Sequence, residues 1–401
     1  MQQKSILIIG GGEIGLNQIR IAKKIGFKVI VTDINPDAPG LKEADMGVNI
    51  SGTDIKGLVT FALENKEKYN ISAVYCGNDF GLLAVECIKQ VLNLPHNSIE
   101  TAIRCINKKL MKDCWIRDGV PTPEGYSINS LDEAKMAIER VGLPIIVKPV
   151  DSSGSQGISF VENREELPYA IQEAFKHTKS KFVLIEKFIE GTHHDVNGFF
   201  YNKKFYKCGV MDRYFTPFPY CVPIRGYYPS ALPKQIIDKI YKVTEKAAKS
   251  IGIEEGPVKG DIVLSDDNVY IYEISNRFHG DVSTSHLYTF CRSVSPIELY
   301  MQTLYQQREV YNGDMPTPNN ICGWYVLNFK PGKINEIKGL DRARNIRGVE
   351  KILLNKKVGD TINPLKDNTD VPGFVWICGK TRKDIHEKYN KVMETIMIEY
   401  E

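Results

Sequence analysis

Two acidic residues twelve positions apart, Asp261 and Glu273, lie in a segment that can hold them side by side. The segment GDIVLSDDNVYIYEISNRFHG has two alternating apolar runs around residues 265–268, which predicts a β-hairpin. Because alternate side chains of paired strands share a face, we expect both carboxylates on one face, with Arg277 just beyond. Lys259 has the same strand parity and either joins that face or is an exposed strand lysine. Mg²⁺ binds carboxylate and phosphate oxygens, so the hairpin predicts a metal–phosphate site, unless it is an acidic hairpin on a solvated edge.

A lysine followed by a loop of small residues forms a second candidate site. In IIVKPVDSSGSQGISFVE, Lys148 ends an apolar strand and a glycine- and serine-rich loop leads to the next strand. Backbone N–H groups of such a loop can surround phosphate oxygens, and the lysine adds a positive charge. The small residues of this loop are Ser152, Ser153, Gly154, Ser155 and Gly157. The alternative is a flexible hairpin loop with a lysine extended along the surface.

The segment FVLIEKFIEGTHHDVNG has the character of a connection between two lobes. Its apolar strand ends in Glu186, Lys187 and Phe188, whose backbone groups can face an adenine edge between apolar walls. His193 and His194 are adjacent, so they point to opposite sides of a strand and do not share a metal ion. Each is either a ligand contact or a hydrogen-bonded structural histidine.

A glycine turn follows the first predicted strand of the chain. Gly10, Gly12 and Gly15 form a GxGxxG pattern, and Asp33 ends the next strand. This spacing is typical of dinucleotide binding, in which a pyrophosphate approaches the N-terminus of a helix. The same backbone N–H groups can instead hold a substrate carboxylate or phosphate.

The elements that position these residues alternate between strands and helices over the first part of the chain. SILIIG, FKVIVTD and AVYCG are predicted strands, and EIGLNQIRIAKKIG and LLAVECIKQVL are predicted helices. This alternation predicts an α/β unit with a parallel sheet covered on both faces. A smaller α+β unit follows, and antiparallel strands from Thr192 onward form a second sheet that includes the acidic hairpin. Short strands and a helix over RKDIHEKYNKVMETIMI are predicted at the end.

The composition is that of an ordinary globular protein. The chain has 401 residues, of which 42% are hydrophobic and 25% charged. Its net charge of +3 is too small to argue for a nucleic-acid or membrane partner, and we expect neither. Residues 1–4 lead straight into a strand, so we expect no signal peptide, and no apolar run is long enough to span a membrane. Nine cysteines without a CxxC pair fit reduced thiols, so we expect a cytoplasmic protein.

The order of these motifs resembles that of the ATP-grasp superfamily. Lys108, Lys148 with its glycine loop, the EKFIEG segment and the acidic hairpin with Arg277 follow one another along the chain. The loop KPVDSSGSQG and the segment EISNRFH are similar to motifs of the formate-dependent glycinamide ribonucleotide transformylase. Biotin carboxylases and L-amino acid ligases are the other branches that the chain resembles.

The resemblance covers nearly the whole chain and implies three parts. They are a Rossmann-like pre-ATP-grasp domain, an ATP-grasp core of two α+β subdomains and a small β-rich C-terminal subdomain. Their expected ranges are residues 1–105, 106–315 (with a lid subdomain at about 120–190) and 316–401.

The resemblance also implies roles for single residues toward ATP. Lys108 and Lys148 contact the phosphates, and the loop 152–157 closes over them. Glu186, Lys187 and Phe188 belong to the hinge beside the adenine, and His193 lies at the position of a ribose contact.

The implied metal ligands are Asp261, Glu273 and Ser275, which would hold Mg²⁺ or Mn²⁺, with two ions expected. Asp261 stands where glutamate is usual, and Ser275 stands where asparagine is common. Arg277 and Lys148 are the implied catalytic residues.

The activity implied by the resemblance is ATP-dependent joining of a carboxylate to an amine through an acylphosphate, with release of ADP and phosphate. We expect small-molecule substrates as partners and a homodimer as the default assembly. Substrate contacts are expected from Gly11, Gly12 and Glu13 after the first strand, from Arg225 and from His279. Arg225 lies in DRYFTPFPYCVPIRGYYPS, which resembles the acceptor-pocket segment of amino-acid ligases, where a guanidinium can bind a carboxylate.

Two other functions remain open from the sequence. One is an NAD(P)-dependent oxidoreductase that uses the GxGxxG turn, and the other is an ATP-binding regulatory protein without turnover. The segment NPLKDNTDVPGF has two aspartates and no arginine pair, which argues against binding a ribonucleotide phosphate there.

Overall fold

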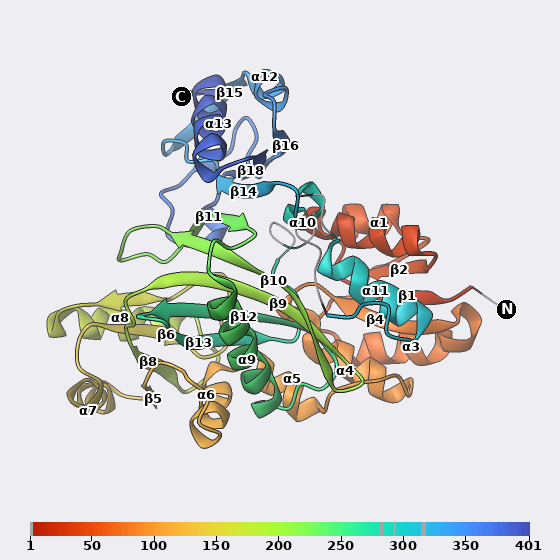
Figure 1. The fold of residues 1–401 in the computed structure, drawn as a ribbon, viewed down its shortest axis with the longest axis horizontal. Coiled ribbons are helices and arrows are strands. Elements are labelled where there is room, and N and C mark those ends of the chain that lie inside the picture. Colours follow the sequence, from red (N-terminus) through yellow and green to blue (C-terminus); the bar gives the residue numbers. More distant parts are fainter. Residues whose placement is uncertain (1–2, 281–283, 285, 292–293, 314–317) are drawn as a thin grey trace.

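The computed structural model describes residues 3–280, 284, 286–291, 294–313 and 318–401 (Figure 1). Residues 1–2 of the expected lead-in and the expected domain boundary between 315 and 316 lie outside these ranges. Within the described ranges, no helix is long and apolar enough to cross a membrane. In Figure 1 the N-terminal part lies at the right, the expected lid at the lower left and the C-terminal part at the top.

The N-terminal part is built on a parallel sheet with the strand order β3-β2-β1-β4. Its strands are β1 (Ser5–Ile9), β2 (Lys28–Thr32), β3 (Met46–Val48) and β4 (Ile71–Cys76). Its helices are η1 (Glu13–Gly15), α1 (Leu16–Ile25), α2 (Pro39–Glu43), α3 (Ile55–Tyr69), η2 (Asp79–Gly81), α4 (Leu82–Val91) and α5 (Ile99–Cys105), where η denotes a short 3₁₀ helix. Every residue of β1 is buried, because α1 covers one face of the sheet and α3 and α4 cover the other. The predicted α/β unit is confirmed.

One face of this sheet is completed by a helix from far along the chain. After α10 (Leu287–Phe290), the helix α11 (Pro296–Gln306) packs against α1. Leu299 and Tyr300 of α11 share an apolar cluster with Ile6 and Ile8 of β1. The N-terminal part therefore includes a segment that the sequence analysis assigned to the core.

A small four-stranded sheet with two helices forms the expected lid. The sheet has the order β5-β8-β6-β7. Its elements are β5 (Gly125–Ile128), α7 (Leu131–Val141), β6 (Ile145–Pro149), β7 (Ser159–Val161), η3 (Arg164–Glu166), α8 (Leu167–Lys176) and β8 (Val183–Lys187), preceded by α6 (Lys108–Arg117). Apolar residues of α7 and α8 pack on one face of the sheet, so the predicted α+β unit is confirmed.

The second large sheet runs through the middle of the molecule in the order β13-β12-β9-β10-β11-β14-β18-β16. Its strands are β9 (Thr192–Tyr201), β10 (Lys204–Phe215), β11 (Pro223–Tyr228), β12 (Gly256–Ser265), β13 (Asn268–Ser275), β14 (Ile321–Val326), β16 (Val349–Leu354) and β18 (Gly373–Gly379). The helix α9 (Lys234–Ser250) packs its apolar side against this sheet through Ile240, Val243 and Ala247. The strands expected in a separate C-terminal part thus continue the core sheet.

The rest of the C-terminal part lies beyond that sheet. It contains a three-stranded sheet in the order β17-β15-β19. Its elements are β15 (Gly332–Lys338), α12 (Leu340–Arg344), β17 (Thr361–Ile362), η4 (Asn368–Asp370), α13 (Arg382–Thr395) and β19 (Met397–Tyr400). The helix predicted over 382–398 therefore ends early, and its last residues form a strand because they pair with β15.

Candidate active site

The acidic hairpin forms as predicted, with Asp261 of β12 directly opposite Glu273 of β13. Its turn is made by Asp266 and Asp267, which both have positive φ angles, as the twist of a two-residue hairpin requires. Lys259 is buried and faces the acids: its Nζ lies 2.9 Å from Asp261 Oδ2 and 2.9 Å from Glu273 Oε1. The exposed-lysine alternative is therefore wrong, and a lysine bridges the two carboxylates.

The charges around this hairpin keep its acids ionised. Burial acts to raise the pKa of Glu273, but Lys108 and Lys259 lower it to about 2. Lys108 Nζ lies 3.3 Å from Glu273 Oε2. For Asp261, burial also acts to raise the pKa, and Lys259 and the hydrogen bond from His279 hold it well below its usual range.

Arg277 meets an acid from the N-terminal part that the sequence analysis missed. Its Nε and Nη2 donate to the two oxygens of Asp79 at 2.7 and 2.6 Å. The Ser275 hydroxyl donates to the same carboxylate at 2.9 Å, so Ser275, expected as a metal ligand, supports Asp79 instead. Burial acts to raise the pKa of Asp79, but Arg277 keeps it well below the usual range. The sequence did contain a signal for Asp79 as a site residue. Asp79 follows the carboxyl end of a predicted parallel strand, where ligands of α/β sheets commonly bind.

Lys148 is held by Glu186, and a second lysine joins them. Glu186 Oε2 contacts Lys148 Nζ, and Glu186 Oε1 lies 2.6 Å from Lys112 Nζ. All three side chains are buried. Burial and the adjacent Lys148 act to lower the pKa of Lys112, and Glu186 opposes them. The Glu186 carboxylate thus positions Lys148, a role that the motif did not indicate.

Three hydrogen bonds connect the glycine loop to other segments of the chain. Lys108 Nζ donates to Ser152 O at 2.7 Å, and Ser155 Oγ donates to Cys221 O at 2.8 Å. Gly154 O accepts a hydrogen bond from the backbone N–H of Asn368 in η4, at 3.2 Å. The C-terminal part therefore contacts the loop that was expected to close over phosphates.

Two backbone N–H groups of the hinge segment donate hydrogen bonds to other residues of the protein. The N–H of Lys187 donates to Glu124 O at 2.8 Å, and the N–H of Phe188 donates to Pro144 O at 3.0 Å. These two donors are therefore not available to an adenine edge. The Phe188 ring packs edge-on against Phe160 and Phe218, with centroid distances of 5.0 and 5.3 Å.

His193 and His194 point in different directions, as predicted. His194 is buried and its Nδ1 lies 2.8 Å from Asp212 Oδ1, so it is a structural histidine. His193 packs edge-on against Phe215, and its Nδ1 has no hydrogen-bond partner among the described residues. Burial, aided by Arg213, lowers the pKa of His193 to about 4, so its ring is neutral near pH 7.

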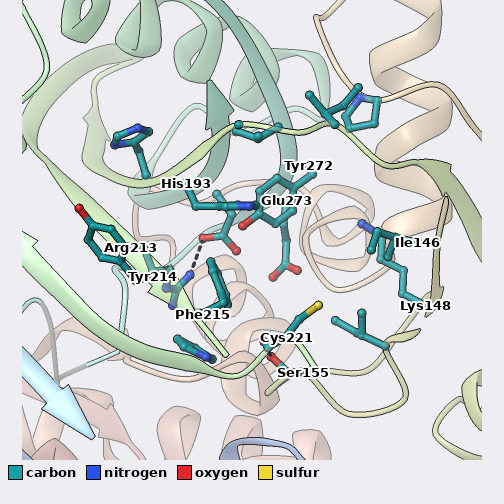
Figure 2. Close-up of a pocket in the computed structure, with 18 of the residues that line it drawn as sticks. Ile146, Lys148, Ser155, His193, Arg213, Tyr214, Phe215, Cys221, Tyr272 and Glu273 are labelled. Atoms are coloured by element: carbon teal, nitrogen blue, oxygen red, sulfur yellow. Dashed lines mark hydrogen bonds and ion pairs between the residues drawn. The ribbon is translucent and has the colours of Figure 1, made fainter. Parts of the chain in front are cut away.

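Most of the predicted residues surround one cavity of about 600 Å³ between the lid and the central sheet. In Figure 2, Lys148, Arg213 and Glu273 point into it from three different elements. The predicted residues that line it are Lys108, Lys148, Ser152, Ser153, Gly154, Ser155, Glu186, Lys187, Phe188, His193, Asp261, Glu273 and Arg277. Those that do not line it are Gly11, Gly12, Glu13, Gly157, Arg225, Ser275 and His279.

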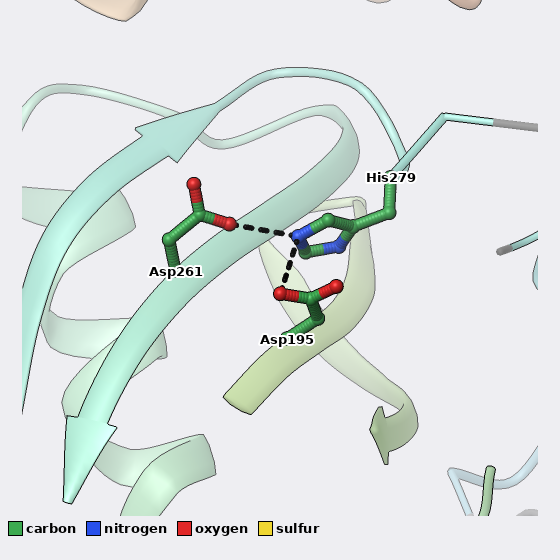
Figure 3. A group of neighbouring side chains, drawn as sticks. All are labelled: Asp195, Asp261 and His279. Atoms are coloured by element: carbon green, nitrogen blue, oxygen red, sulfur yellow. Dashed lines mark hydrogen bonds and ion pairs between the residues drawn. The ribbon is translucent and has the colours of Figure 1, made fainter. Parts of the chain in front are cut away.

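A group of buried polar side chains lies directly behind Asp261 (Figure 3). His279 Nε2 lies 2.8 Å from Asp261 Oδ1 and 3.5 Å from Asp195 Oδ1. Arg213 Nη1 approaches the same two oxygens, at 3.5 and 3.0 Å. His279, expected as a substrate contact, thus positions Asp261, and Asp195 and Arg213 are further residues that the sequence analysis missed.

The C-terminal part contributes side chains to the cavity wall. Asn368 and Arg382 both line it. Arg382 forms an ion pair with Asp212 of β10, and its guanidinium stacks over the Tyr227 ring at 4.9 Å. Neither residue lies in a recognisable motif. Each reaches the cavity only because the C-terminal strands extend the central sheet.

Arg225 lies behind the cavity wall. Its guanidinium stacks 4.5 Å above the ring of Tyr214, which does line the cavity. Its Nε is buried and has no hydrogen-bond partner in the described part of the chain. An acceptor carboxylate would have to reach it past Tyr214.

The N-terminal glycine turn is stabilised by its own neighbours. Gly11 N–H donates to Asp33 Oδ2 at 2.7 Å, and Asn35 N–H donates to Asp33 Oδ1 at 2.8 Å. Asp33 therefore caps this turn and the following loop, whereas a dinucleotide site needs this acid to bind a ribose. Gly12 and Glu13 are exposed at the same edge of the sheet.

Comparisons with known proteins agree with this architecture. Residues 141–285 match the family model of the ATP-grasp domain, and residues 325–401 match that of the L-amino acid ligase C-terminal domain 2. The chain is 24% identical over 293 residues to the carbamoyl phosphate synthase large chain of Clostridium acetobutylicum, covering 68% of this chain and 27% of that protein. It is 26% identical over 194 residues to the formate-dependent phosphoribosylglycinamide formyltransferase of Prochlorococcus marinus, covering 47% of this chain and 48% of that protein.

A solved structure covers the full length. The crystal structure of L-amino acid ligase from Bacillus licheniformis has a TM-score of 0.85 and 19% identity, with 100% of both chains covered. The two chains therefore share their fold from end to end, whereas the matches to the two relatives above span less than half of each relative's own length.

Proposed function

We propose that this chain, whose residues 141–285 match the ATP-grasp domain, is an ADP-forming ligase that joins a small-molecule carboxylate to an amine. The observation that carries the proposal is the single cavity in which Lys108, Lys148 and Arg277 converge with Glu273 and the glycine loop. Cations, a loop of backbone donors and a carboxylate are the groups that phosphoryl transfer from a nucleotide requires.

ATP binds with its adenine beside the hinge and its phosphates under the glycine loop. Phe188, Phe218 and Ile146 supply apolar walls for the base. Because the N–H groups of Lys187 and Phe188 are used elsewhere, the donor for the adenine edge is the N–H of Ile189, which makes no backbone hydrogen bond among the described residues. Lys108 and Lys148 then face the phosphates.

The reaction proceeds in two displacements. A carboxylate oxygen of the substrate attacks the γ-phosphorus of ATP, and the bond to the β,γ-bridging oxygen breaks, which gives an acylphosphate and ADP. The amine nitrogen attacks the acyl carbon and loses a proton, and phosphate leaves as the amide forms. Arg277 and Lys148 stabilise the charge on the transferred group, and no enzyme nucleophile is needed.

A divalent ion such as Mg²⁺ or Mn²⁺ supplies charge neutralisation on the phosphate oxygens when bound, and Glu273 is the carboxylate that would hold it. Glu273 fits this role, because its side chain lines the cavity and keeps 22% of its surface exposed. The other expected carboxylate, Asp261, fits less well, because its side chain is only 8% exposed and its Oδ1 is shared by His279 and Arg213.

The carboxylate and the amine bind where the N-terminal sheet meets Arg277. Asp79 follows β4 and contacts Arg277, and the glycine turn follows the neighbouring strand β1. Loops after adjacent parallel strands lie together at one edge of the sheet, so Gly11, Gly12 and Glu13 are near this end of the site. The match of residues 325–401 to an L-amino acid ligase domain supports an amino acid as one of the substrates.

Phosphate release from ATP, measured with pairs of carboxylates and amines that include all amino acids, tests this function. We expect release to require one carboxylate and one amine, with a product lighter than their sum by one water. ATP binding without turnover on any pair would favour a regulatory protein, and NAD(P) binding without ATP binding would favour an oxidoreductase.

A further inference from the structure

We propose that the Lys259 ammonium is a built-in cation that takes the place of one of the two expected divalent ions, so that the enzyme works with one divalent ion per nucleotide. The inference rests on the proposed function, because it concerns the nucleotide site of that function. It is carried by the contacts of Lys259 and Asp261.

The Lys259 ammonium occupies the position between the two carboxylates that a bridging ion would need. Lys259 and Asp261 are two residues apart on β12, so their side chains share a face, and Glu273 pairs across from Asp261. Lys259 Nζ lies 2.9 Å from one oxygen of each acid. The lysine is only 5% exposed, so the ammonium does not swing into solvent without losing its packing.

Asp261 offers less to a metal ion than Glu273 does, because its side chain is 8% exposed and that of Glu273 is 22% exposed. Its Oδ2 accepts from Lys259, and its Oδ1 lies 2.8 Å from His279 Nε2 and 3.5 Å from Arg213 Nη1. The aspartate side chain is one methylene shorter than glutamate, which keeps its carboxylate back among these buried donors. Asp261 therefore anchors Lys259, and Glu273 is the metal-binding carboxylate of the hairpin.

The charges around the acidic hairpin balance before any metal ion enters. Four carboxylates contact four cationic side chains through ion pairs: Asp79, Asp195, Asp261 and Glu273 with Lys108, Lys259, Arg213 and Arg277. A nucleotide brings one divalent ion with it on its phosphates. A second ion would have to displace a buried, paired ammonium from between two acids, which leaves that ammonium without a counter-charge.

The group formed by Asp195, Asp261 and His279 does not supply a second site either. Its three ligand atoms lie within 4.8 Å of one another, as in many cation sites. However, Arg213 Nη1 already lies 3.0 Å from Asp195 Oδ1, and the guanidinium supplies the positive charge that an ion would bring.

Counting bound Mn²⁺ by electron paramagnetic resonance tests the proposal. The protein is titrated with Mn²⁺ at a saturating concentration of AMP-PNP, a non-hydrolysable ATP analogue. We expect one ion per wild-type chain, two in Lys259→Ala, and one in Lys259→Arg, which keeps the cation. Lys239→Ala is the matched control, because Lys239 is an exposed lysine that contacts the hairpin turn, and it should also bind one ion.

Two ions in the wild-type chain, or one in Lys259→Ala, would overturn the proposal while leaving the ligase function standing. Failure of the wild-type chain to bind AMP-PNP would overturn both. If Lys259→Ala does not fold, as judged by circular dichroism, Lys259→Met keeps the length of the side chain and replaces it. A second readout is the turnover rate at increasing free Mg²⁺, beyond the amount that equals the ATP concentration. The rate should stay constant in the wild type and rise in Lys259→Met.

Discussion

At the scale of single residues, the cavity is organised by carboxylates that hold cations in place. Glu186 holds Lys148 and Lys112, and Asp79 holds Arg277. A lysine or arginine beside a phosphate site must be fixed to act on one oxygen, and an ion pair on the far side fixes it. Glu273 also contacts lysines, but its side chain is 22% exposed, whereas that of Glu186 is 4% exposed.

We expect Glu273→Gln to lower ATP turnover by about 10²-fold or more, because it removes the charge that holds a divalent ion and the phosphates. Phosphate release measures this, and circular dichroism checks the fold. Asp267→Asn is the control, because Asp267 is an exposed acid at the turn of the same hairpin. Turnover of Glu273→Gln close to that of Asp267→Asn would remove Glu273 from the site.

His193 makes stability depend on pH. Burial, aided by Arg213, lowers its pKa from 6.5 to about 4. The unfolded chain therefore binds this proton at a higher pH than the folded chain, so the free energy of unfolding is largest above about pH 6.5 and falls as the pH drops toward about 4. We expect His193→Gln to weaken this fall, as measured by urea unfolding at about pH 8 and about pH 4.5. An equal fall in both proteins would assign the effect to other groups.

Arg225 tests how far the acceptor pocket extends. We expect Arg225→Ala to raise the KM of the amine substrate by about tenfold, the loss of about one charged contact, and that of ATP by less. Initial rates with each substrate varied in turn measure this. Tyr325→Phe is the control, because Tyr325 is a buried residue that pairs with Arg225 in the strand register. Equal changes in the KM of the amine and in the KM of ATP would place Arg225 outside the pocket.

At the scale of elements, the parts of the fold with a strong local pattern were predictable. Strands of alternating apolar residues, the acidic hairpin and the glycine loop follow from spacing alone. Two elements were missed for different reasons. The helix α9 carries a long apolar stripe that periodicity could have found, whereas the end of α13 was missed because β19 forms only by pairing with the distant strand β15. Asp195 and Arg382 were not predictable as site residues, because packing between distant segments brings them to the site.

The glycine loop offers a test at this scale. Gly157 has a φ of +70°, and an added Cβ would lie 2.9 Å from His177 Cβ and Pro149 Cγ. We expect Gly157→Ala to destabilise the protein by about 1–3 kcal/mol, through both strain and collision. Gly12→Ala is the matched control, because Gly12 has a φ of −65° and open space around it, and its effect should stay within about 0.5 kcal/mol. Denaturant unfolding measures both, and similar losses would contradict the structure of the loop.

At the scale of the whole molecule, the cavity is where all the parts of the chain meet. The lid supplies the glycine loop, the central sheet the acidic hairpin, and the C-terminal part Asn368 and Arg382. The N-terminal part reaches the site through the pair between Asp79 and Arg277. A change at this pair should therefore affect both the stability of the molecule and its activity.

We expect Asp79→Asn to lower the free energy of unfolding by about 1–3 kcal/mol, because it leaves the Arg277 guanidinium without its counter-charge in a mostly buried place. Thermal or denaturant unfolding measures this loss. Asp113→Asn is the control, because Asp113 pairs with Lys109 on an exposed helix face, and such pairs contribute less than about 1 kcal/mol. Equal losses in the two variants would mean that the N-terminal part is not held by this pair.

The late position of helix α11 in the sequence affects how the N-terminal part folds while the chain is being translated. When residues 1–105 leave the ribosome they carry every strand of the N-terminal sheet, yet the apolar cluster around Ile6 and Ile8 lacks Leu299 and Tyr300, which are made about two hundred residues later. Beside α1, part of this face of the sheet thus stays uncovered until most of the core has been translated. The first part to be made is among the last to be finished, and during that interval its uncovered apolar surface favours association with other chains.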